Sequence, residues 1–109
     1  MGDWIEIGSV DKIPHLGARV VHIDGRVIAL FRTANDEIFA LRDRCPHKEG
    51  PLSQGIVHGK RVTCPLHNLV LDLTNGKAVP PDVGCVPAYP VKVKEGSVWI
   101  TLQGATIPE

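Results

Sequence analysis

Two short segments of this sequence each combine a cysteine with a histidine. The first reads C-P-H-K from Cys45, and the second reads C-P-L-H-N from Cys64. Two thiolates and two imidazoles make a complete set of four metal ligands. This soft and borderline set suits zinc or iron–sulfur chemistry and disfavours magnesium or calcium. The sequence therefore predicts a metal centre held by Cys45, His47, Cys64 and His67.

The way in which the ligands are divided between the two segments separates the two kinds of metal centre. A structural zinc site usually pairs cysteine with cysteine in one loop and histidine with histidine in another. Here each loop mixes the types, as C-x-H and C-x-x-H. Both thiolates can then bind one iron while both imidazoles bind the other. The spacing predicts an iron–sulfur cluster, and a zinc site or a site without metal are the alternatives.

The elements that would position these loops are short strands joined by tight turns. Alternating or apolar runs are separated by turn signals at Asp24-Gly25, Asn35-Asp36, Gly59-Lys60, Asn75-Gly76 and Glu95-Gly96. Such spacing predicts strands at 19–23, 26–32, 38–41, 56–57, 61–63, 69–73, 91–94 and 97–102, with a short helical turn at 10–13. We expect an all-β antiparallel sandwich or small barrel, in which a hairpin over 54–63 brings the two loops side by side.

Length and composition narrow the class of protein. A chain of 109 residues with 43% hydrophobic residues fits one domain, 1–109, with one core. The 12 basic and 12 acidic residues cancel, which disfavours a nucleic-acid partner. The N-terminus lacks the pattern of a signal peptide, and no apolar run is long enough to span a membrane. We therefore expect a cytoplasmic protein. In that compartment thiols stay reduced, so the odd number of cysteines (3) indicates metal binding or burial rather than disulfides.

The wider pattern around the ligands resembles the signature of Rieske proteins. The first loop continues from Lys48 as x-G-P-L-S-x-G to Gly55, and the second is C-P-L-H-N. Three further segments, 31–33, 59–62 and 82–85, make the whole chain similar to the small subunit of assimilatory NAD(P)H-dependent nitrite reductase. Some members of that family have lost the ligands, whereas this chain keeps all four.

The resemblance implies a fold and a set of roles. The fold would be a Rieske-type antiparallel β-sandwich with a small cluster-binding subdomain of two loops. Cys45 and Cys64 would bind the inner iron of a [2Fe–2S] cluster, and His47 and His67 would bind the outer iron near the surface. The pair Pro80-Pro81 resembles the proline-containing third loop that covers the cluster in this fold.

Three functions of different classes remain open. The resemblance favours an electron-transfer subunit whose large partner carries FAD, siroheme and a further iron–sulfur cluster and reduces nitrite to ammonia with NAD(P)H. The second function is a free-standing Rieske-type ferredoxin that serves an aromatic-ring dioxygenase and its flavin reductase. The third is a structural or sensory module. The chain contains no nucleophile with an adjacent base and no glycine-rich phosphate loop, so we do not expect it to be catalytic alone.

The remaining histidines and the third cysteine fall outside the ligand motif. We expect His15, His22 and His58 to be surface residues that bind no metal. Cys85 follows Gly84 in a proline-rich segment, and we expect it to be a small packed residue rather than a fifth ligand.

The loop composition also predicts the reduction potential of the cluster. High-potential Rieske proteins carry an additional cysteine in each loop and hydroxyl groups that bond to the cluster sulfurs, whereas these loops offer Lys48, Leu66, Asn68 and Leu69. Fewer hydrogen bonds leave the reduced cluster less stabilised. We therefore expect a midpoint near the low end of the Rieske range, roughly −150 mV. A redox titration followed by visible absorption measures it, and a midpoint well above zero would contradict the expectation.

Overall fold

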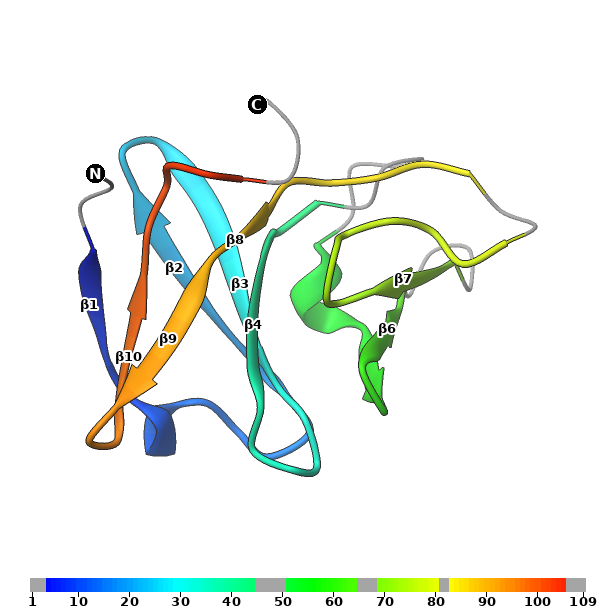
Figure 1. Ribbon diagram of the computed structural model, residues 1–109. Coiled ribbons are helices and arrows are strands. Elements are labelled where there is room, and N and C mark those ends of the chain that lie inside the picture. The colour runs from blue at the N-terminus through cyan, green and yellow to red at the C-terminus, as the bar shows by residue number, and fades with distance from the viewer. Residues whose placement is uncertain (1–3, 45–50, 65–68, 81–82, 106–109) are drawn as a thin grey trace.

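The computed structural model describes residues 4–44, 51–64, 69–80 and 83–105 (Figure 1). In these ranges the secondary structure is β-strand with two single-turn 3₁₀ helices, which confirms the predicted all-β class. No helix in them is long and apolar enough to cross a membrane. The elements in chain order are β1 (Ile5–Ser9), η1 (Val10–Lys12), β2 (Ala18–Ile23), β3 (Arg26–Arg32), β4 (Ile38–Arg42), η2 (Leu52–Gln54), β5 (Ile56–His58), β6 (Arg61–Thr63), β7 (Val70–Asp72), β8 (Ala88–Tyr89), β9 (Val91–Lys94) and β10 (Ser97–Ile100).

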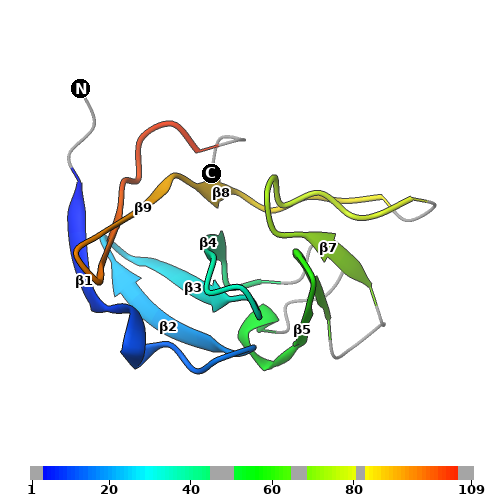
Figure 2. The ribbon, with the colours of Figure 1, turned by 60° about the horizontal axis from the view of Figure 1, so that its bottom comes forward.

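The strands form three antiparallel sheets. One sheet has the order β1–β10–β9, the second β2–β3–β4–β8, and the third β5–β6–β7. In Figure 1 the β1–β10–β9 sheet lies on the left, β2–β3–β4 in the middle, and the hairpin of β6 and β7 on the right; the turned view of Figure 2 keeps this order. The third sheet, whose strands flank the segments that carry the predicted ligands, corresponds to the predicted small subdomain.

The tight turns confirm the hairpins that the sequence predicts. Asp24 and Gly25 have φ angles of 50° and 77°, and Glu95 and Gly96 have φ angles of 52° and 77°. Two consecutive positive φ angles define a type I′ turn, whose twist matches that of the strands on either side. Ile23 accordingly pairs with Arg26 at the end of the β2–β3 hairpin.

Two strands were not predicted from the sequence. β1 pairs with β10 through a register shift between Glu6 and Gly8, and Gly8 has a φ of 134°. This irregularity interrupts the alternation by which a strand is recognised. β8 has only two residues and pairs with Ala40 and Leu41 of β4. A two-residue strand has no periodicity of its own, so only its partner defines it.

Within the middle sheet, β3 is buried on both faces. Ile28 and Leu30 of β3 belong to the apolar cluster shared with the β1–β10–β9 sheet, whereas Ala29 and Phe31 belong to the cluster shared with the β5–β6–β7 sheet. All four are fully buried. Alternate side chains of a strand point to opposite faces, and here both faces are covered. This explains the continuous apolar run of β3, which is typical of a strand buried on both sides.

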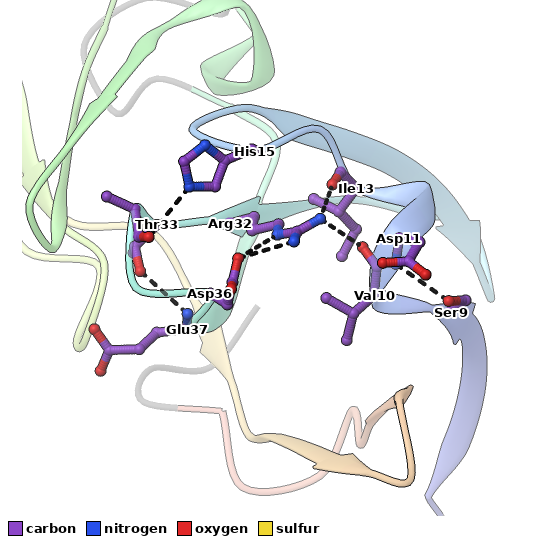
Figure 3. Close-up of polar contacts among 10 residues, drawn as sticks. Ser9, Val10, Asp11, Ile13, His15, Arg32, Thr33, Asp36 and Glu37 are labelled. Carbon is purple, nitrogen blue, oxygen red and sulfur yellow. Dashed lines mark hydrogen bonds and ion pairs between the residues drawn. The ribbon is translucent and has the colours of Figure 1, made fainter.

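An arginine at the end of β3 ties three segments together (Figure 3). The guanidinium of Arg32 donates to the carbonyl oxygens of Val10 and Ile13 at 3.4 and 3.0 Å, and to the carboxylate of Asp36 at 2.8 Å. Nearby, a ring nitrogen of His15 lies 3.1 Å from the carbonyl oxygen of Ala34. These contacts fix η1 against the turn between β3 and β4, at the margin of the sandwich.

Replacing Gly76 should destabilise the fold more than replacing a turn glycine of the same conformation. Gly76 has a φ of 74°, and a Cβ atom there would overlap the carbonyl oxygen of Val86. Gly25 has a φ of 77° with nothing near its Cβ position. Gly25→Ala should therefore lower the free energy of unfolding by about 1 kcal/mol for conformation alone. Gly76→Ala should lower it by roughly 2–4 kcal/mol, because a steric cost is added. Urea unfolding measures both values, and equal losses would contradict the packing argument.

Candidate metal centre

Of the four predicted ligands, only Cys64 lies in the described part of the chain. Cys45, His47 and His67 lie outside the described residues. Within the described ranges, no three histidine, cysteine or carboxylate side chains come together to hold a metal ion. The four-ligand set therefore stays a prediction, and the structure informs it through Cys64 and through the segments at the base of each loop.

Cys64 lies directly after β6 and is fully buried. It belongs to the apolar cluster that also contains Leu52, Leu69 and Leu71. Its backbone N–H donates to the carbonyl oxygen of Leu69 at 2.6 Å, which closes the base of the second ligand loop. A thiol in this position is shielded from water and forms no disulfide with the other described cysteine. These properties suit a ligand of the inner iron.

The hairpin of β5 and β6 brings the bases of the two ligand loops together, as the sequence predicts. Ile56 at the end of the first loop segment pairs with Thr63, the residue before Cys64. Gly55 packs so closely on β6 that a Cβ atom would overlap the carbonyl oxygen of Thr63. The absence of a side chain at Gly55 therefore allows the two chain segments to approach.

Two polar residues at the base of the first loop were not predicted from the sequence. Asp43 precedes the loop and Ser53 follows it, and the Asp43 carboxylate accepts hydrogen bonds from the backbone N–H and the hydroxyl of Ser53. Their separation of ten residues fits none of the short-range capping or turn patterns. The sequence feature that could have identified these two residues is their position on either side of the segment that carries Cys45 and His47.

The segment predicted to form a third loop is joined to the same subdomain. Val79 donates to the carbonyl of Val70 in β7 at 2.8 Å, and Ala78 donates to the carbonyl of Gly84 at 2.9 Å. Residues 77–79 and 84–86 therefore run as an extended pair beside β7 (Figure 1). Pro80 lies at an exposed turn of this pair, and Pro81 lies outside the described residues. That this segment covers a cluster stays a prediction.

The other histidines are exposed, as expected, but Cys85 is not packed. His15, His22 and His58 are exposed, and a ring nitrogen of His58 lies 2.7 Å from the hydroxyl of Thr63. The expectation that Cys85 is a small packed residue is wrong, because Cys85 is exposed. Its backbone pairs with Lys77 at the edge of the extended pair, and this position turns the side chain outward.

Charged groups of both signs lie at the turn of the β5–β6 hairpin and at the base of the first loop. The Lys60 ammonium lies 3.3 Å from a carboxylate oxygen of Glu37, and both side chains are exposed. An exposed pair of this kind contributes little to stability. The Asp43 carboxylate is half-buried and faces Ser53.

Comparison with known proteins identifies the family. The model of the Rieske-like [2Fe–2S] domain matches residues 3–101. This chain belongs to the Rieske-like [2Fe–2S] domain family. Its cofactor is accordingly a [2Fe–2S] cluster, and the chain is an electron-transfer domain.

Two curated relatives of this Rieske domain are ferredoxin components of dioxygenase systems. The 3-phenylpropionate/cinnamic acid dioxygenase ferredoxin subunit of Photorhabdus laumondii is 39% identical over 101 residues, which cover 86% of this chain and 90% of that protein. The ferredoxin component of the naphthalene 1,2-dioxygenase/salicylate 5-hydroxylase systems of a Ralstonia species is 31% identical over 102 residues, which cover 93% of this chain and 97% of that protein.

A solved structure shares the fold. The protein from Mycobacterium tuberculosis that is provisionally named an NADH-dependent nitrite reductase small subunit superposes with a TM-score of 0.84, covering 93% of this chain and 96% of that one. The sequence identity is 24%, so the likeness shows the common fold and no more. The predicted Rieske-type fold is thereby confirmed.

The described residues fit the cluster that the family implies. Cys64 supplies a thiolate donor within an apolar wall, and the hairpin of β5 and β6 brings the bases of the two predicted ligand loops together. A soft thiolate suits an iron–sulfur cluster, and an apolar wall on one side limits the access of solvent to it.

Cys64→Ser should abolish cluster binding, because a serine hydroxyl replaces the soft thiolate at a predicted ligand position. We expect loss of the visible iron–sulfur absorption and of bound iron in the purified variant. The matched control is Cys85→Ser, which changes an exposed cysteine outside the motif and should keep both signals. Retention of the full spectrum in Cys64→Ser would exclude this residue as a ligand.

Proposed function

We propose that this chain is the electron-transfer small subunit of a cytoplasmic NAD(P)H-dependent nitrite reductase, which reduces nitrite to ammonia. The observation that carries this proposal is the sequence resemblance outside the ligand loops, at residues 31–33, 59–62 and 82–85. The fold shared with the Mycobacterium tuberculosis protein is compatible with it. In this proposal residues 1–109 form one domain, and FAD, siroheme and the NAD(P)H site belong to the large subunit.

The proposed ligands are Cys45 and Cys64 for one iron and His47 and His67 for the other. The bound cluster supplies one-electron transfer. The residues of this chain hold the site dry from the interior side, where Leu52 and Leu69 pack in the same apolar cluster as Cys64. In this proposal the electrons pass to the partner at His47 and His67, the ligands of the outer iron.

Two exposed apolar side chains are compatible with a protein partner. Ile56, next to the base of both loops, is 70% exposed, and Val83, which precedes the extended pair beside β7, is 73% exposed. They are the most exposed large apolar side chains in the described part of the chain. In this proposal both side chains become buried against the large subunit.

A second candidate is a free-standing Rieske ferredoxin for an aromatic-ring dioxygenase. The specific observation that favours it is the identity of 31–39% with two dioxygenase ferredoxin components over most of both chains. Its partners would be the oxygenase and a flavin reductase. Both candidates use the same fold and the same cofactor, so the partner distinguishes them.

Affinity purification of the tagged chain from its own cells should recover a large protein that contains siroheme and FAD. The recovered complex should reduce nitrite with NADH or NADPH. Recovery of an oxygenase or a flavin reductase, or of the chain alone as a red-brown protein, would contradict the nitrite reductase proposal and favour the ferredoxin.

The same complex tests whether the cluster serves electron transfer or assembly. If Cys64→Ser assembles with the large subunit but the complex loses nitrite reduction, the electron-transfer role is supported. If the variant fails to assemble while Cys85→Ser assembles normally, the cluster has the structural role instead.

A further inference from the structure

A carboxylate joins the two ends of the first ligand loop. Oδ1 of Asp43 accepts a hydrogen bond from the backbone N–H of Ser53 at 2.7 Å, and Oδ2 accepts one from the Ser53 hydroxyl at 2.8 Å. Both residues are half-buried. Hydrogen bonds to a charged acceptor are stronger than neutral ones. We call this pair of residues the Asp43–Ser53 clasp.

The clasp provides η2 with a hydrogen-bond acceptor that the residue before this helix does not supply. The first N–H groups of a helix have no acceptor within the helix, and the residue before it normally supplies one from its side chain. That residue is Pro51, which makes no side-chain hydrogen bond to η2. Asp43 supplies the acceptor for Ser53 from the other end of the loop. The capping of η2 is therefore coupled to closure of the loop.

Each half of the clasp is attached to a different rigid part of the molecule. The backbone N–H of Asp43 donates to the carbonyl of Val27 in β3 at 2.9 Å. On the other side, Leu52 is fully buried in the apolar cluster and Gly55 packs directly on β6. The hydrogen bonds between Asp43 and Ser53 thus join the middle sheet to the subdomain that carries Cys64.

The two ligand loops are closed by different means. The second loop is short, and the backbone hydrogen bond from Cys64 to Leu69 closes it. The first loop is longer, and its closure has the larger entropic cost. Side chains, rather than backbone alone, close this one. A single substitution can therefore open the first loop while the backbone pairing of β5 with β6 remains.

We propose that Asp43 and Ser53 are positioning residues for the cluster, whose clasp holds the segment carrying Cys45 and His47 in its ligating position. This inference rests on the proposed ligand set but not on the identity of the partner. Loss of the clasp increases the fraction of time in which the first loop is open, so the cluster is lost faster. The sandwich is unaffected, because neither residue belongs to its apolar cluster.

The test measures cluster loss from the purified full chain in excess EDTA, followed by visible absorption. Asp43→Ala removes both hydrogen bonds to a charged acceptor, and cluster loss should accelerate roughly tenfold or more. Ser53→Ala removes only the hydroxyl bond and should have a smaller effect in the same direction. Ser53→Thr keeps the hydroxyl and should restore a rate close to wild type.

Two matched controls remove similar groups far from the loops. Asp36→Ala deletes a carboxylate that accepts from Arg32, and Ser9→Ala deletes the hydroxyl that accepts from the backbone of Asp11 at η1. Both should lose the cluster at the wild-type rate. If Asp43→Ala and Ser53→Ala lose it no faster than these controls, the proposal is overturned.

Electron paramagnetic resonance of the reduced cluster separates positioning from general stabilisation. Asp43→Ala should broaden or shift the resonances of the clusters that remain, because the ligands of the first loop are held less uniformly. An unchanged spectrum together with a lowered unfolding temperature would overturn the positioning role. If Asp43→Ala fails to fold, the comparison of Ser53→Ala with Ser53→Thr decides by the same two measurements. The assays contain no partner, so failure to recover a nitrite reductase leaves their outcome intact.

Discussion

Burial of both faces of β3, in the interior of the β2–β3–β4–β8 sheet, is the constraint on which the rest of this structure depends. Ile28 and Leu30 point to the sandwich, and Ala29 and Phe31 point to the ligand-loop subdomain. Fully burying a large apolar side chain contributes about 1.5–3 kcal/mol, and β3 contributes to both clusters. The β1–β10–β9 sheet and the β5–β6–β7 sheet therefore pack as two layers on opposite sides of β3. The position of one layer is defined relative to the other.

The same sheet also determines where the loops begin. The first ligand loop follows β4, and the third segment leads into β8, which is the neighbour of β4 in the sheet. The backbone N–H of Arg42 donates to the carbonyl of Pro87 at 3.0 Å where these segments meet. β4 and β8 are antiparallel, so the end of β4 lies beside the start of β8. The segment that follows β4 therefore comes close to the segment that precedes β8, although they are distant in the sequence. The hairpin of β5 and β6 brings Cys64 to this region from a different sheet.

This arrangement suits an electron carrier, because it combines a dry interior with an accessible exterior. Cys64 lies in an apolar cluster that excludes water, and solvent access is one of the properties that set the potential of an iron–sulfur cluster. On the outside, Ile56 at the start of β5 and Val83 in the segment before β8 remain exposed. The apolar side chains around Cys64 therefore both stabilise the fold and shield the predicted ligand from water. Contacts with a partner are left to the outer surface.

The sequence by itself determined the hairpins and the all-β class and predicted the ligand types, because each of these is a local pattern. Asp24-Gly25 and Glu95-Gly96 form type I′ turns from their own backbone preferences, and the mixed cysteine–histidine loops specify their chemistry by composition. The family match confirmed the cluster type, while the ligand set is still a prediction. Only the tertiary structure decided the register of β1, the existence of β8, the exposure of Cys85 and the hydrogen bonds between Asp43 and Ser53. Each of these depends on residues distant in the chain, whose contacts follow from the packing of the sheets and leave no periodic or short-range signal in the sequence.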